Sequence, residues 1–143
     1  MIRLAEEKDI PVLAELAALA WSGSAEDYLE DMAELLESDR DLVAVSAEGE
    51  QVTGFVNARL RYEYVSGAHS SPVAYLESLS VFAPWRRRGI ARELAEYAQA
   101  WGRSRGCSQM GSDCRLDNEA SYRLHLALGF AEVERQITFV KQL

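Results

Sequence analysis

Cysteine and histidine are scarce in this sequence, with two residues of each. Cys107 and Cys114 are too few for a disulfide framework, and they lack the CxxC spacing or nearby histidines of a zinc site. We therefore expect two reduced thiols and no bound metal. A catalytic thiol is the disfavoured alternative.

Long apolar runs are also missing. Nothing approaches the ~20 consecutive apolar residues of a membrane span, and the first residues lack the apolar centre of a signal peptide. With 143 residues, the chain can build one core but not two ordinary ones. We expect a single domain over residues 1–143, located in the cytoplasm.

Basic residues are outnumbered, with 15 Lys and Arg against 23 Asp and Glu, a net charge of −8. This balance disfavours nucleic acid, whose phosphates would be repelled. It suits a cationic substrate, because acidic clefts concentrate positive ligands. Acidity can equally serve only to keep a small protein in solution, and the charge alone favours that second reading.

Apolar periodicity and turn residues predict alternating strands and helices, in the order β-α-α-β-β-β-α-β-α-β-β. Asp9 and Ser24 are expected helix N-caps, and Gly129 an expected helix end. The expected helices cover residues 9–20, 25–37, 90–104 and 118–128. The expected strands cover residues 2–4, 42–47, 52–61, 74–82, 109–112, 131–134 and 137–141.

The most informative segment runs from Arg86 to Ala91, where a strand ends, the chain turns and a helix begins. The first N–H groups of a helix have no internal partner and lie at the positive end of its dipole. Gly89 and Ala91 let a phosphate approach the backbone, and the arginines add charge. The turn therefore predicts a pyrophosphate site, with a solvated turn as the alternative. The glycine spacing is neither that of a Rossmann fingerprint nor that of a Walker loop.

The pattern Arg86-x-x-Gly89-x-Ala91 resembles the acetyl-CoA-binding motif of the GNAT superfamily of N-acetyltransferases. Asn118, followed by Gly129 and Phe130, resembles the superfamily's next motif at the expected separation. The resemblance implies a mixed α+β fold, with a central mixed, largely antiparallel sheet flanked by about four helices. It also implies acetyl-CoA as the acetyl donor.

More of the chain is similar to one subgroup, the small aminoglycoside 6′-N-acetyltransferases. The similarity is weakest over the first 60 residues, and the poorly matched region 22–40 leaves the drug range open. The subgroup implies an aminoglycoside substrate and a homodimer. The matching stretches are residues 61–65, 70–73, 75–77, 101–102, 106–107, 112–113 and 129–135.

The subgroup also implies site residues. Glu77 and Asp113 are the expected catalytic residues. The positions that line the aminoglycoside site are Trp21, Tyr64, Glu77, Asp113 and Glu134. The positions that hold the cofactor are Leu79, Ser80, Val81, Arg87, Arg88, Gly89, Ile90, Ala91, Arg92 and Asn118.

The chemistry agrees with these roles. A protonated amine must lose a proton before it attacks a thioester, and a nearby carboxylate can accept that proton directly or through water. Glu77 is either this base or only a binding group for the cation. A free backbone N–H near Leu79 to Val81 would stabilise the oxyanion. His125 stands where many superfamily members have a tyrosine acid, and it either protonates the thiolate or only packs. Trp85 and Trp101 are expected packing residues.

Three functions compete on this sequence. The first is acetylation of the aminoglycoside 6′-amine. The second is acetylation of another amine, such as a polyamine or a protein amine, which the acidic segment 25–37 would suit equally. The third is a silent acyl-CoA-binding module. Tyr64, Glu77 and Asp113 favour the first, and the carboxylates at positions 77 and 113 argue against the third.

Overall fold

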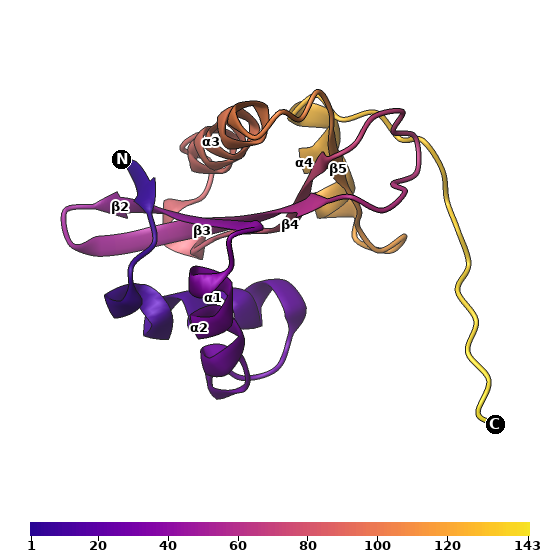
Figure 1. Ribbon diagram of the computed structural model, residues 1–143. Coiled ribbons are helices and arrows are strands. Elements are labelled where there is room, and N and C mark those ends of the chain that lie inside the picture. The colour runs from indigo at the N-terminus through magenta and orange to yellow at the C-terminus, as the bar shows by residue number, and fades with distance from the viewer.

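A five-stranded sheet forms the middle layer of the computed structural model, which describes residues 1–143 (Figure 1). The strands lie in chain order, and each neighbouring pair is antiparallel except the last, which is parallel. This arrangement confirms the expected mixed, largely antiparallel sheet. The strands are β1 (Ile2–Leu4), β2 (Asp41–Glu48), β3 (Gln51–Arg61), β4 (Val73–Val81) and β5 (Met110–Ser112).

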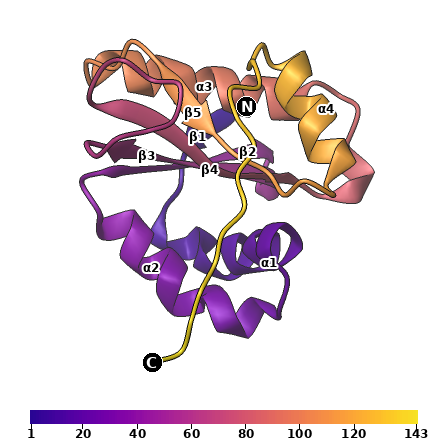
Figure 2. The ribbon, with the colours of Figure 1, turned by 90° about the vertical axis from the view of Figure 1, so that its right-hand side faces the viewer.

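Two helices cover each face of the sheet (Figures 1 and 2). On one face lie α1 (Ile10–Trp21) and α2 (Leu29–Glu37), and on the other lie α3 (Ile90–Ser104) and α4 (Glu119–Ala127). Three short 3₁₀ turns complete the chain: η1 (Glu7–Asp9), η2 (Ala25–Tyr28) and η3 (Ala83–Trp85). None of the helices is both long and apolar enough to cross a membrane.

The alternation of β2 and β3 builds two cores, one on each face of the sheet. Val45 and Phe55 face α1 and α2 and pack with Leu13, whereas Ala44 and Val56 face α3. Because both faces are covered, the two strands are apolar almost throughout rather than alternately polar.

The beginnings of the first two helices differ from expectation. Asp9 precedes α1 but its side chain makes no cap hydrogen bond to it; instead it pairs with Arg3 at 2.7 Å and accepts a hydrogen bond from the Glu6 N–H. The expected helix 25–37 is divided into η2 and α2. Ser24 caps η2 together with Asp27, and this reciprocal capping box fixes the tight first turn.

The middle of β4 contains a β-bulge. Leu76 is opposite Ala58 and Ser78 is opposite Asn57, so Glu77 is the extra residue between two consecutive residues of β3. Leu76 and Leu79 consequently both pack into the α3-side core although they are three residues apart. A bulge redirects the side chain of the extra residue, here a carboxylate.

The sheet opens immediately after this bulge. β5 pairs with β4 only over residues 74–76, whereas β3 pairs with β4 as far as Val81. Residues 77–81 of β4 therefore have no strand on the β5 side. Apart from the Val81 carbonyl, which accepts a hydrogen bond from Arg86, their backbone polar groups on that edge are available to a ligand.

The two strands expected at residues 131–134 and 137–141 are not formed. The chain after α4 is extended but unpaired, and it runs away from the sheet (Figures 1 and 2). Ile137 and Phe139 are 81% and 91% exposed. The sequence expectation was wrong here because an alternating apolar pattern becomes a strand only where a partner edge accepts its hydrogen bonds.

Candidate active site

The expected cofactor turn lies directly beyond the opening of the sheet, since β4 leads through η3 into α3. Gly89 is the residue before α3 and has a left-handed conformation with φ of 80°. The first backbone bond to this turn is donated by the Glu93 N–H to the Gly89 carbonyl, so the preceding N–H groups of the helix have no helical partner. A Cβ added to Gly89 would meet no protein atom within 4 Å. The turn therefore has both the donors and the open space that a pyrophosphate requires.

The arginines of the turn have separate contacts. Arg86 donates a hydrogen bond to the Val81 carbonyl, Arg88 stacks on the Trp85 ring, and Arg92 donates to the Ala127 carbonyl at the end of α4. Arg87, which has a φ of 63°, makes no hydrogen bond or ion pair with the protein. Three arginines thus brace the turn and its neighbours, and Arg87 retains its donors for an anionic ligand.

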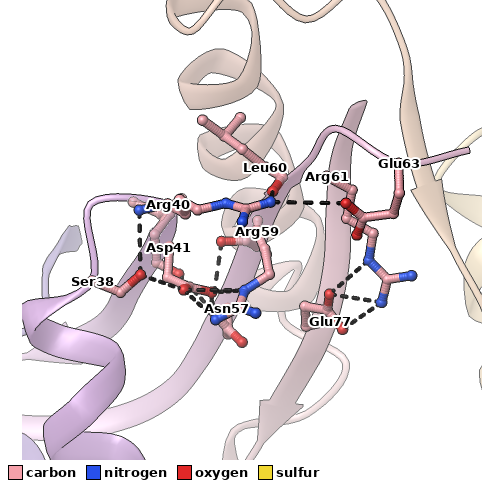
Figure 3. A network of polar contacts seen from close by, with 11 residues as sticks. Ser38, Arg40, Asp41, Asn57, Arg59, Leu60, Arg61, Glu63 and Glu77 are labelled. Atoms are coloured by element: carbon pink, nitrogen blue, oxygen red, sulfur yellow. Dashed lines mark hydrogen bonds and ion pairs between the residues drawn. The ribbon is translucent and has the colours of Figure 1, made fainter. Parts of the chain in front are cut away.

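Glu77 projects from the bulge and is paired with Arg61 of β3 (Figure 3). Arg61 Nη2 lies 2.8 Å from Oε1 and 3.1 Å from Oε2, and Arg61 Nε lies 3.1 Å from Oε1. A second pair lies beside it, between Arg59 of β3 and Asp41 of β2 (Figure 3).

Asp113 follows β5 and accepts a hydrogen bond of 2.6 Å from the Tyr75 hydroxyl. Burial, and in addition this hydrogen bond to a carboxylate, raise the pKa of Tyr75 well above its ordinary value. The phenol is therefore a neutral hydrogen-bond donor throughout the range in which enzymes work. Because Arg61 Cζ lies 3.5 Å from the centre of the Tyr75 ring, a continuous series of contacts joins Glu77 to Asp113.

A cleft of about 1530 Å³ lies between β5, α4 and the C-terminal segment. Of the residues expected to bind substrate, Tyr64, Asp113 and Glu134 line it. Tyr64 is 83% exposed, and Glu134 accepts a hydrogen bond from the Ser66 hydroxyl. The structure thus brings these three residues to one cleft.

Two of the expected substrate residues lie outside that lining. Glu77 is at the bulge, next to the open edge of β4. Trp21 ends α1, where its ring lies 5.6 Å from that of Tyr28. The substrate role of Trp21 stays a prediction, since no contact joins it to the other four residues.

His125 and Asn118 are both engaged within the protein. His125 Nδ1 lies 2.7 Å from the Ser121 carbonyl, which can only accept, so Nδ1 carries a hydrogen. Its Nε2 lies 2.7 Å from the Ser112 hydroxyl, and this contact ties α4 to β5. Asn118 caps α4 by accepting a hydrogen bond from the Ser121 N–H. These contacts do not test the expected roles, so thiolate protonation or packing by His125 and cofactor binding by Asn118 stay predictions.

Sequence reasoning assigned no role to Arg61 and Tyr75. Their signal was an arginine near the end of one strand and a Tyr-x-Glu pattern in the next. The bulge shifts the pairing at Glu77, so the sequence did not reveal which residue of β3 would reach its carboxylate. Among the cysteines, Cys107 is buried and burial raises the pKa of its thiol, which disfavours it as a nucleophile.

A sheet that opens beside a helix start with free N–H groups and open space, with carboxylates at the opening, is the arrangement expected of an acyl-CoA-dependent N-acyltransferase. Residues 10–130 match the acetyltransferase (GNAT) family, and the chain belongs to this family. It is an N-acetyltransferase that takes its acetyl group from acetyl-CoA. The expected packing roles of Trp85 and Trp101 are confirmed, since both pack against the α3-side core.

Individual relatives align with most of this chain. An aminoglycoside N(6′)-acetyltransferase type 1 from Acinetobacter genomosp. 13 is 39% identical over 129 residues, 90% of this chain and 88% of the relative. The crystal structure of an aminoglycoside 6′-N-acetyltransferase from Acinetobacter haemolyticus superposes with a TM-score of 0.94 at 34% identity, covering 100% of this chain and 99% of that one. The structure of AAC(6′)-Iy with the bisubstrate analogue CoA-S-monomethyl-acetylneamine superposes with a TM-score of 0.91 at 34% identity. The match covers 100% of this chain and 98% of that one.

Proposed function

We propose that this N-acetyltransferase acetylates the 6′-amine of aminoglycoside antibiotics and thereby confers resistance to them. The observation that carries the proposal is the placement of Glu77 and Asp113. One projects from the bulge at the open edge of β4, and the other lies in the adjoining cleft. An aminoglycoside carries several ammonium groups, and two separated carboxylates can hold one and deprotonate another. The relatives described above carry this activity in their names.

In this reaction the amine nitrogen forms a bond to the acetyl carbonyl carbon, and the carbon–sulfur bond breaks. Acetyl-CoA, when bound, supplies the thioester. Glu77 accepts the proton that the amine loses, directly or through a water molecule. Free N–H groups of residues 77–81 donate to the carbonyl oxygen as negative charge develops there. The departing thiolate needs little help, since thiols have pKa values near ~8.5.

Binding of the donor falls to β4 and α3. Leu79, Ser80 and Val81 offer backbone groups to the pantetheine arm, because their β5-side edge has no strand. Gly89, with the N–H groups of the first turn of α3, receives the pyrophosphate, and Arg87 adds a positive charge. The expected cytoplasmic location, where acetyl-CoA is available, is part of this proposal.

The test is regioselectivity. Release of CoA is followed with kanamycin, tobramycin and paromomycin, which has a hydroxyl in place of the 6′-amine. Kanamycin and tobramycin should be acetylated and paromomycin should not, because an amine is the nucleophile. Equal turnover of paromomycin would contradict the 6′ assignment. Spermidine and a lysine peptide in the same assay distinguish the other amine classes, and no CoA release with any amine would indicate a silent binding module.

We further propose a homodimer. The C-terminal segment carries exposed apolar side chains at Val133, Ile137, Phe139 and Val140, and it forms no strand with its own chain. The outer edge of β5 is also unpaired. In a dimer, the C-terminal segment of one copy would pair with the open edge of β5 of the other and bury its apolar side chains there.

A further inference from the structure

We propose that Arg61 and Tyr75 are positioning residues for acetyl transfer, which hold Glu77 and Asp113 in one coupled arrangement. The inference rests on the proposed function, because it takes Glu77 as the base and Asp113 as a substrate carboxylate. It adds Arg61 and Tyr75 to the proposed active site. The four residues contact one another in the order Glu77, Arg61, Tyr75, Asp113.

Arg61 holds Glu77 with one edge of its guanidinium, the edge formed by Nε and Nη2. Nε and Nη2 each donate to Oε1, and Nη2 also reaches Oε2. The side chains of Arg61 and Glu77 are 31% and 25% exposed, so the pair is neither fully solvated nor fully buried. A planar, forked contact of this kind fixes the direction of a carboxylate in a way that a single ammonium does not.

Glu77 depends on this contact for its orientation. It is the extra residue of the bulge, so no residue of β3 is directly opposite it. Its carboxylate makes no hydrogen bond other than those from Arg61. Without Arg61, the side chain would sample several rotamers beside the open edge of β4.

Tyr75 connects this pair to the second carboxylate. The face of its ring lies 3.5 Å from Arg61 Cζ, a stacked cation–π contact, and its hydroxyl donates to Asp113 Oδ2 at 2.6 Å. Tyr75 is only 8% exposed and lies on β4, two residues before Glu77. Because the Tyr75 ring is buried on β4, it is a rigid support. It fixes the position of the Arg61 guanidinium above its face and the position of the Asp113 carboxylate at its hydroxyl.

The charge of Arg61 gives the arrangement a distinctive kinetic consequence. A cationic guanidinium next to the site repels a polycationic substrate, so it does not contribute to drug affinity. Its contribution is geometric and acts on the chemical step. Removing Arg61 should therefore lower kcat without weakening the binding of the aminoglycoside, whereas loss of a merely structural residue lowers stability and affinity together.

The experiment compares Arg61→Lys and Arg61→Gln with the matched variants Arg59→Lys and Arg59→Gln. Arg59 lies two residues away on β3, opposite Tyr75 in the ladder, and makes a similar forked pair with Asp41 of β2. Neither the Arg59 nor the Asp41 side chain makes a hydrogen bond or ion pair with Glu77, Tyr75 or Asp113. Both Arg61 variants should lose kcat by roughly 10- to 100-fold, the scale of a misplaced catalytic group. Their aminoglycoside Kd, measured by calorimetry, should not rise. The lysine variant of Arg59 should keep wild-type kcat.

Tyr75→Phe tests the hydrogen bond between Tyr75 and Asp113. The variant keeps the ring against the guanidinium and removes only the hydroxyl. Drug binding should weaken by about tenfold, as expected for one lost hydrogen bond to a charged group, and kcat should stay near wild type. Arg61→Lys combined with Tyr75→Leu, which removes the stack, should show non-additive losses in a double-mutant cycle.

Three outcomes would overturn the inference. The first is wild-type kcat in both Arg61 variants while Glu77→Gln is slow, which rejects Arg61 and leaves the proposed function intact. The second is a parallel loss of kcat, drug affinity and melting temperature in Arg61→Lys, which indicates a structural role only. The third is full activity of Glu77→Gln, which rejects the base itself and the inference with it. The assay uses the best amine of the panel, so the comparison does not depend on which amine that is.

Discussion

At the residue scale, Glu77 and Asp113 are held by different partners, and the difference leads to different kinetic expectations. Glu77 is at the bulge, two residues before the part of β4 proposed to hold the acetyl group, and it is oriented by a guanidinium. Asp113 lies on the wider cleft and is oriented by a neutral phenol. One position suits proton transfer, and the other suits retention of an ammonium group.

We therefore expect Glu77→Gln to lower kcat by something like 10²–10⁴-fold, the usual contribution of a general base. Asp113→Asn should instead raise the aminoglycoside KM. A lost charge-assisted contact costs roughly 1.5–3 kcal/mol, or about ten- to hundredfold in affinity. Steady-state kinetics measure both, and calorimetry on the drug is needed because KM equals Kd only when chemistry is slow.

Full kcat of Glu77→Gln at saturating drug would contradict the base assignment, and the proton would then pass to water or to Asp113. Glu48→Gln is the matched control for charge alone. It removes an exposed carboxylate at the end of β2, outside the lining of the cleft. This control should leave both constants near wild type.

Asp9 contributes to the loss of stability in acid. Its hydrogen bonds from the Arg3 guanidinium, against a smaller opposing effect of burial, hold the pKa of Asp9 below its ordinary value. A lowered folded-state pKa stabilises the protein above the unfolded pKa of about 3.9, and that stabilisation is lost as pH falls through the folded value. Asp9→Asn should therefore lower the free energy of unfolding by about 1–3 kcal/mol at pH 7.

The difference between Asp9→Asn and the wild type should shrink once the pH falls below about 4, because the wild-type carboxyl becomes protonated there. Urea unfolding at several pH values measures this. Glu119→Gln, which breaks the exposed Glu119–Arg123 pair on α4, should change stability little at any pH. A difference that stays constant down to pH 2 would mean that the ion pair is not the cause.

At the scale of elements, the start of α3 carries the clearest expectation. Gly89 has a φ of 80°, a region that L side chains rarely adopt, and the space in front of it is open. Gly89→Val should strain the turn and block the approach of the pyrophosphate, so acetyl-CoA binding should weaken much more than aminoglycoside binding. Calorimetry on the two ligands tests this.

The other end of α3 provides the matched control. Gly106 has a φ of 85° and equally open surroundings, but it lies after the helix rather than before it. Gly106→Val introduces the same backbone strain far along the chain from the proposed pyrophosphate turn. Equal losses of acetyl-CoA affinity in the two variants would show that strain, not the cofactor turn, is responsible.

The sequence predicted those elements whose determinants are local. Apolar periodicity placed α1, α3, α4 and strands β1 to β5, and the turn before α3 followed from Gly89 and its neighbours. The bulge at Glu77 was not predictable, because it depends on how two distant strands align. The strands expected after Gly129 failed for the same reason: residues 131–141 have the pattern of strands but no partner edge. For the candidate site, Glu77 and Asp113 were predicted from the sequence, whereas their partners Arg61 and Tyr75 were not.

At the scale of the whole molecule, the C-terminal segment should determine the oligomeric state. Phe139 is 91% exposed in a segment that leaves its own domain. Phe139→Glu places a charge at the proposed interface and should convert a dimer into a monomer, because an unpaired charge is costly to bury. Light scattering coupled to size-exclusion chromatography measures the mass.

Gln142→Glu adds the same charge to the same segment at a polar position and should remain dimeric. A wild-type protein that is monomeric at all concentrations would contradict the homodimer. If Phe139→Glu stays dimeric, the interface lies elsewhere on the surface.

The bulge in β4 also bears on how this enzyme could lose its activity in evolution. If Glu77 were deleted, Leu76 and Ser78 would become neighbours opposite Ala58 and Asn57, and the ladder with β3 would be continuous. Leu79 would still face α3, and the pyrophosphate turn would be untouched. A single in-frame codon loss would thus leave the proposed acyl-CoA-binding elements in register and remove the proposed base. The same change in reverse, one inserted codon in a regular strand, is a short route by which such a binding protein could acquire catalysis.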